Sequence, residues 1–147
     1  MRIFAKHQHA LDPATQIPPE TAARRRYQPR EPNVFTPAQI TALMAATAML
    51  SPQFRALTWR NLIGLLAATG MRPGEACRLS VGDIDLAGAT IKVLATKFDK
   101  SRLVFLHPST VAVLEHYLHV RRDWAKTDSA CPVVFLNTRG GPIDPSK

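Results

Sequence analysis

The sequence contains little cysteine and little glycine. Its 147 residues include only two cysteines, Cys77 and Cys131, and 7 glycines, whereas 46% of the residues are hydrophobic. The cysteines form no CxxC pair and have no histidine at metal-ligand spacing, which argues against a zinc site and against a disulfide framework. This composition excludes a disordered chain and is typical of one globular domain, in which both cysteines serve as small apolar residues.

Long apolar runs are absent as well. No stretch reaches the roughly 18 consecutive apolar residues that a membrane-spanning helix needs. The amino-terminal segment MRIFAKHQHALD lacks the order of a signal peptide, in which basic residues precede an apolar run. We therefore expect no membrane insertion, no secretion and a cytoplasmic location.

Acidic residues are also scarce. The chain has 11 Asp and Glu against 19 Lys and Arg, which gives a formal net charge of +8. A basic surface attracts polyphosphates and releases counterions when it binds them. Arginine outnumbers lysine by 13 to 6, and its planar guanidinium suits bidentate contacts to phosphate. The balance favours double-stranded DNA as partner, while a surface that only maintains solubility is the alternative.

Residues 1–33 differ from the rest of the chain in composition. They contain five prolines, show little apolar periodicity and include the cluster Arg24, Arg25, Arg26 and Arg30. We interpret them as a basic, proline-rich linker or arm. It is either a solvated tail or a segment that follows a DNA backbone.

Helix signals begin at Thr36. Thr36, Pro37 and Gln39 predict a capped helix over 36–50, and a second helix is predicted over 53–69 with Gly70 as its left-handed stop. Pro73 then opens a short third helix. Its N-cap is Arg72, which therefore lies on the connection between two helices.

Strand signals follow. β-Branched and apolar residues predict strands over 90–95 and 102–106, joined by a polar hairpin tip. A helix over 109–125 is expected to turn Val113 and Tyr117 inward and Arg121 and Arg122 toward water. A last strand is predicted over 133–136. The order predicts an α+β fold that is mostly helical, with a small β-hairpin or sheet.

Arg72 has two interpretations. It can form an ion pair with Glu75, three residues later. Alternatively, the positive end of the third helix already satisfies Glu75, which leaves the Arg72 guanidinium free for an external anion such as a phosphate. Lys97, at the hairpin tip, is either a solvated charge or a second cation of the same site.

Three stretches of the sequence resemble the tyrosine site-specific recombinases of the phage integrase family. The stretch ATGMRPGEACRLSVGDIDL is similar to the first arginine box of that family, and IKVLATKFDKSRLVFLHPST to its lysine-bearing hairpin. The run VVFLNTRGGPI resembles the segment before the second box. The resemblance covers about residues 34–147 and implies part of a recombinase catalytic domain, preceded by the interdomain linker.

The resemblance also implies roles for single residues. Arg72 corresponds to the first catalytic arginine, which holds the scissile phosphate, and Glu75 to the acidic residue that supports the site. Lys97 matches the lysine that acts as general acid, while Lys100 and Arg102 are candidates for DNA-backbone contacts. The family joins DNA through a phosphotyrosine intermediate, without a metal or a small-molecule cofactor, and its protomers act together, so other recombinase protomers are candidate partners.

The remaining motifs of the family are not found at the expected places. Its second box, a later His or Trp and the nucleophilic tyrosine all follow the part that matches 133–143. His119–Arg122 spells HxxR, but within the predicted helix, and we interpret it as coincidence. Tyr27 and Tyr117 are interpreted as structural, and His116 with His119 lacks a third metal ligand.

We therefore expect a partial catalytic domain, truncated before the second box and inactive alone. One alternative is a noncatalytic DNA-binding module or a regulator of a full-length recombinase. Another is a small helical interaction protein whose basic charge is incidental.

Overall fold

The computed structural model describes residues 2–19, 32–94, 101–125 and 131–144. The chain divides into the units Met1–Val34 and Phe35–Lys147.

The first unit contains a helix that was not predicted from the sequence. The helix α1, Arg2–Leu11, ends before the first proline of the arm, so no helix-breaking residue interrupts it. Ile3, Phe4 and Leu11 recur at helical spacing, and all three side chains are exposed. The expectation of little apolar periodicity over residues 1–33 is therefore wrong for α1.

The second unit begins with the predicted capped helix. In α2, Pro37–Ala46, the Thr36 hydroxyl accepts a hydrogen bond from the backbone N–H of Gln39 at 3.3 Å. The Gln39 side chain accepts from the Thr36 N–H at 2.8 Å in return. The reciprocal capping box fixes where the helix starts. The short 3-10 helix η2, Thr47–Met49, completes the predicted stretch.

The next two helices confirm the predicted connection around Arg72. α3 spans Gln53–Thr69, and Gly70 follows it with a φ of 64°, the left-handed conformation that glycine adopts without steric cost. α4 spans Pro73–Arg78 and has Arg72 as its N-cap in extended conformation. Proline at the first helical position therefore places Arg72 immediately before α4.

A three-stranded antiparallel sheet follows, in the order β1-β2-β3. The predicted strands are confirmed in slightly shorter form as β2, Thr90–Val93, and β3, Arg102–Phe105. β1, Ile84–Asp85, was not predicted, because a two-residue strand has too little alternation to be recognised. The 3-10 helix η3, Val81–Asp83, precedes it where a turn was expected. Helices with this small sheet confirm the α+β class.

The predicted strand over 133–136 is not a strand in the structure. Only isolated bridges form there, between Ser80 and Val133 and between Leu136 and Pro142. Val134, Phe135 and Leu136 are instead buried in an irregular segment. The Val134 N–H donates a hydrogen bond to the Leu79 carbonyl at 2.8 Å.

The last long helix is α5, Pro108–Ala125. The expectation for Arg121 on this helix was wrong. It was predicted to face water, but it donates hydrogen bonds to the carbonyl oxygens of Cys131, Val133 and Val134 at 2.6–3.1 Å. The irregular segment has few backbone partners for these carbonyls, and buried carbonyls require hydrogen bonds. Arg121 therefore attaches this segment to α5.

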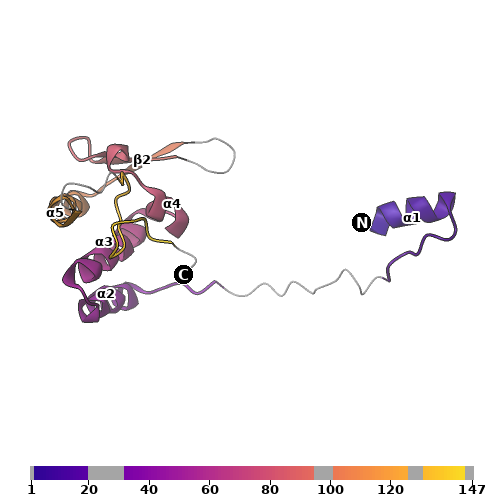
Figure 1. The fold of residues 1–147 in the computed structure, drawn as a ribbon, viewed down its shortest axis with the longest axis horizontal. Helices are drawn as coiled ribbons and strands as arrows, with labels where there is room; N and C mark the ends of the chain where they lie inside the picture. The colour runs from indigo at the N-terminus through magenta and orange to yellow at the C-terminus, as the bar shows by residue number, and fades with distance from the viewer. Residues whose placement is uncertain (1, 20–31, 95–100, 126–130, 145–147) are drawn as a thin grey trace. The chain divides into compact units, whose positions relative to one another are not determined.

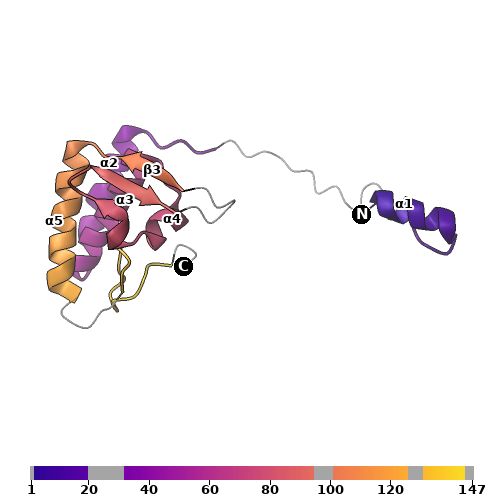
Figure 2. The same ribbon diagram turned by 90° about the horizontal axis from the view of Figure 1, so that it is seen from above.

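The core of the second unit lies among α3, α5, the sheet and the 131–144 segment. In Figure 1, α3 lies between α2 and the sheet, and Figures 1 and 2 both show α5 along one side. Stacked aromatic side chains belong to this core. The ring of Phe54 stacks on that of Trp124 at a centroid distance of 4.0 Å, and the ring of Tyr117 on that of Phe135 at 5.4 Å. Cys77 is buried in this core as predicted, and burial raises the pKa of its thiol.

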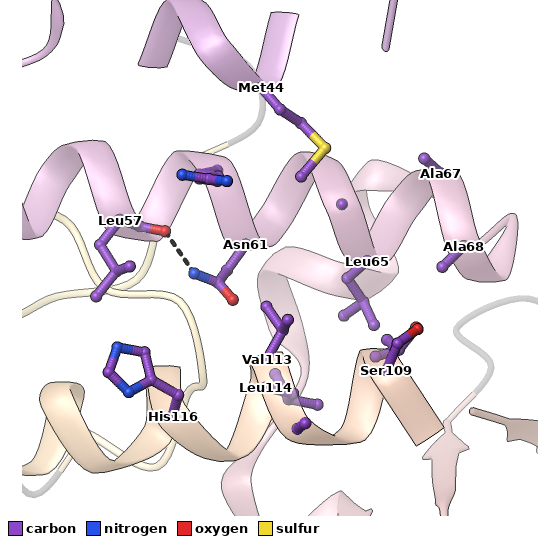
Figure 3. Close-up of a pocket in the computed structure, with 14 residues that line it drawn as sticks. Met44, Leu57, Asn61, Leu65, Ala67, Ala68, Ser109, Val113, Leu114 and His116 are labelled. Carbon is purple, nitrogen blue, oxygen red and sulfur yellow. Dashed lines mark hydrogen bonds between the residues drawn. The ribbon is translucent and has the colours of Figure 1, made fainter. Parts of the chain in front are cut away.

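An open, mostly apolar groove of about 810 Å³ runs between α3 and α5. Figure 3 shows side chains of these two helices facing each other across it, with Met44 of α2 at its edge. Val113, which was predicted to turn inward, lines the groove with 56% of its surface exposed. Across the ranges that the structure describes, no helix is long and apolar enough to cross a membrane.

Candidate functional site

Arg72 projects from the junction of α3 and α4 into solvent. Its backbone is fixed by Gly70 on one side and Pro73 on the other. The side chain is 80% exposed although the neighbouring Met71 is buried. The local structure therefore fixes the backbone of Arg72 and leaves its guanidinium accessible.

Glu75, in the first turn of α4, is the buried member of the site. Its side chain is only 6% exposed and accepts four hydrogen bonds. The Arg72 backbone N–H donates to Oε2 at 2.9 Å, and the Arg72 Nη1 donates to Oε1 at 3.2 Å. The expectation that the helix end alone satisfies Glu75 was wrong, because the carboxylate also pairs with the Arg72 side chain.

Arg102, at the start of β3, makes the stronger pair with Glu75. Its Nη1 lies 3.1 Å from Oε1 and its Nη2 lies 2.7 Å from Oε2, which is a bidentate arrangement. Arg102 was a candidate for DNA-backbone contact, and its pairing with Glu75 was not predicted. The register of the hairpin, in which Arg102 pairs with Val93, brings residues 27 positions apart together, and no sequence spacing indicates that.

The environment of Glu75 keeps its carboxylate ionised. The hydrogen bonds from Arg102 contribute most and the Arg72 N–H next, and together they lower the pKa of Glu75 to about 2, against the opposing effect of burial. Two guanidinium groups and one carboxylate leave the cluster of Arg72, Glu75 and Arg102 with a net charge of +1. Arg72 is the more exposed of the two cations, at 80% against 43% for Arg102. Arg72 is therefore the more accessible cation of this cluster.

Several predicted site residues lie outside the described residues. These are Lys97, Lys100, Arg24, Arg25, Arg26 and Arg30. Their assigned roles stay predictions. The strands on either side of residues 94–101 are described, and their facing ends, Val93 and Arg102, form a pair in the ladder.

The histidines of α5 do not form a metal centre in the structure. His119 Nε2 lies 3.5 Å from Asp123 Oδ2, one helical turn away, and both side chains are exposed. Throughout the described ranges no group of three or more His, Cys, Asp or Glu side chains could hold a metal ion. Arg122, which completes the HxxR pattern with His119, is exposed on the same helix.

Tyr117 is a core residue, as predicted. Its side chain is fully buried, its hydroxyl donates to the Val134 carbonyl at 3.2 Å, and it lies 3.3 Å from the Thr58 hydroxyl. Burial raises the pKa of Tyr117. A buried, hydrogen-bonded phenol has no access to an external phosphate.

Comparisons with known proteins identify the class to which this fold and site belong. The model of the Phage integrase family matches residues 33–147. The putative integrase/recombinase y4rB of Sinorhizobium fredii is 36% identical over 149 residues, which cover 98% of this chain and 48% of that protein. The chain thus spans about half the length of the curated relatives that it matches.

Solved structures agree. The crystal structure of XerA recombinase matches with a TM-score of 0.64 and 28% identity, over 80% of this chain and 40% of that one. The XerH site-specific recombinase bound to a palindromic difH substrate matches with a TM-score of 0.59 and 25% identity, over 78% and 32%. The fold is therefore that of a DNA recombinase catalytic domain, over the part that the chain covers. The chain belongs to the phage integrase family, the tyrosine recombinases.

Proposed function

We propose that this chain forms the DNA-phosphate-binding part of a tyrosine recombinase, in which the Arg72 guanidinium binds the scissile phosphate. The observation that supports the proposal is the cluster at α4. There Arg72, whose backbone is fixed and whose side chain is 80% exposed, lies next to the Glu75 carboxylate, which Arg102 also neutralises. Negative charge grows on the nonbridging oxygens during phosphoryl transfer, and a fixed guanidinium stabilises that charge without reorganisation. The net charge of +8 favours the approach of DNA.

Other cations extend the proposed interface. Lys97, as general acid, would protonate the leaving 5′ oxygen, and Lys100 would contact the DNA backbone. The arginine cluster of the arm, Arg24, Arg25, Arg26 and Arg30, would follow the backbone outside the catalytic part. Other recombinase protomers are proposed partners on the bound DNA. The proposed partner implies a compartment that holds DNA, and the cytoplasm is the predicted one.

We propose further that the 147-residue chain by itself binds DNA without cleaving it. Tyr117 is sealed in the core, and Tyr27 is predicted to be a linker residue. Family membership and strand cleavage are therefore separate properties here. This also supports the second candidate function, a noncatalytic DNA-binding module that acts beside a full-length recombinase.

Fluorescence anisotropy with a labelled 30-base-pair duplex of mixed sequence, measured at several salt concentrations, tests the binding proposal. Arg72→Ala should weaken binding about tenfold at low salt, because a hydrogen-bonded charge contact contributes roughly 1.5–3 kcal/mol. It should also lower the slope of log affinity against log salt by about 0.9, the value for one lost phosphate contact. Arg78→Ala, which removes the same charge from the last turn of the same helix, is the control and should change affinity less than twofold.

Two outcomes would contradict these proposals. Absence of wild-type binding at low salt would favour the helical interaction protein with incidental charge. A covalent protein–DNA band from a pool of nicked, sequence-randomised duplexes, retained after boiling in detergent, would show that the chain cleaves DNA by itself.

A further inference from the structure

One carboxylate, that of Glu75, is shared by two guanidinium groups of different elements. The Arg102 fork occupies both oxygens, at 3.1 and 2.7 Å, whereas the Arg72 side chain reaches only Oε1, at 3.2 Å. Without Arg102, the buried charge of Glu75 would have one cationic partner, and the charges of Glu75 and Arg72 would cancel. With Arg102 present, the cluster carries one positive charge in excess.

We infer that Arg102 is a positioning residue, which occupies Glu75 from β3 and so keeps the Arg72 guanidinium open toward a DNA phosphate. The inference rests on the function proposed above for Arg72. It replaces a direct role of Arg102 on the DNA backbone with an indirect one that acts through Glu75.

The geometry of the fork supports this role. Two parallel N–H···O bonds fix the plane of the carboxylate as well as its distance, which a single bond does not. The fixed carboxylate keeps Oε2 directed at the Arg72 backbone N–H, 2.9 Å away, and this bond defines the first turn of α4. Arg102 therefore affects both the backbone and the side chain of Arg72.

The position of Arg102 in the sheet adds a second consequence. It is the first residue of β3 and pairs with Val93, the last residue of β2. The ion pair with Glu75 thus attaches the loop end of the β2–β3 hairpin to α4.

A double-mutant cycle on the full chain distinguishes the indirect role from direct DNA contact. Affinity for the labelled duplex is measured for wild type, Arg72→Ala, Arg102→Gln and the double variant, at a temperature where melting curves show all four to be folded. Arg102→Gln should weaken binding about five- to tenfold in the wild-type background. In the Arg72→Ala background it should change affinity less than about twofold, because the residue through which it acts is gone.

Two further variants complete the experiment. Arg102→Lys keeps the charge but loses the fork, so it should restore part of the affinity, and it takes the place of Arg102→Gln in the cycle if that variant is unfolded. Lys92→Gln removes an exposed charge from β2 and is the matched control for the loss of one charge from the sheet, with an expected change of about twofold or less.

The outcomes separate the two proposals. Losses that multiply in the double variant, to about 50- to 100-fold, would show that Arg102 contacts DNA itself and would overturn the inference while leaving the proposed function intact. Equal effects of Lys92→Gln and Arg102→Gln would also overturn it, because charge alone would then explain the loss. No wild-type binding would remove the proposed function and the inference together.

Discussion

Arg102 and Glu75 are 27 residues apart in the sequence, and Nη2 of the arginine lies 2.7 Å from Oε2 of the glutamate. The pair joins β3 to α4, two elements that carry different parts of the proposed phosphate site. Because Glu75 is only 6% exposed, its charge requires these partners. Stability and the availability of Arg72 therefore depend on the same carboxylate.

The depressed pKa of Glu75 predicts how stability changes with pH. Its pKa is about 2 in the folded chain and 4.5 ordinarily. A carboxyl with a lowered folded pKa contributes stability that is complete above the unfolded value and is lost as the pH falls through the folded value. The contribution of Glu75 should therefore be constant above about pH 5 and decline between about pH 4.5 and pH 2.

Urea unfolding of wild type and Glu75→Gln, compared from pH 7 to pH 2, measures this contribution. At pH 7 the variant should be less stable by about 2 kcal/mol, since hydrogen bonds to charged groups contribute roughly 1.5–3 kcal/mol. The difference between the two proteins should shrink on acidification. A difference independent of pH down to 2 would mean that Glu75 is not ionised in the folded chain.

Substitution of Arg72 by lysine separates charge from geometry. Arg72→Lys keeps the positive charge but offers no planar fork, so it should bind the duplex several-fold more weakly than wild type. Its salt dependence should remain close to that of wild type, because the number of released counterions follows charge. A salt slope as low as that of Arg72→Ala would contradict this expectation.

Arg121 should be important for stability in spite of its place on a partly exposed helix face. Arg121→Met removes the donors to the carbonyl oxygens of Cys131, Val133 and Val134. The unfolding free energy should fall by about 2 kcal/mol, since the Cys131 and Val133 carbonyls would lose these donors, while the Val134 carbonyl would retain the Tyr117 hydroxyl. Arg122 is the next residue, and its side chain is exposed. Arg122→Ala should therefore change the unfolding free energy by no more than about 0.5 kcal/mol.

Two glycines of α3 and its cap should respond oppositely to alanine. Gly64 lies inside α3, where alanine is favoured by up to about 1 kcal/mol, and a new Cβ would meet only the flexible end of Met44 at 3.1 Å. Gly64→Ala should therefore raise the melting temperature slightly. Gly70 has open space around it but a φ of +64°, so Gly70→Ala should cost about 1 kcal/mol through backbone strain alone. Equal melting temperatures for the two variants would refute this comparison.

Local chemistry in the sequence predicted much of the fold. The Thr36 capping box, the Gly70 stop and the proline after Arg72 each act within a few residues, and all three are confirmed. Apolar periodicity located α3 and α5, because the spacing of apolar residues on one helix face is also a local property of the chain. The predicted strand at 133–136 was wrong, because an apolar run of four residues indicates burial without specifying whether a ladder partner exists.

The candidate site likewise has one part that could be predicted from the sequence and one part that could not. Proline and capping rules place Arg72 before a short helix with Glu75 one turn later, since both residues lie within four positions of the chain. The pairing of Arg102 with Glu75 and the attachment of the 131–136 segment by Arg121 emerge only when the chain is folded. Those contacts depend on strand register and on carbonyls left without backbone partners, and neither property is written in the spacing of residues along the chain.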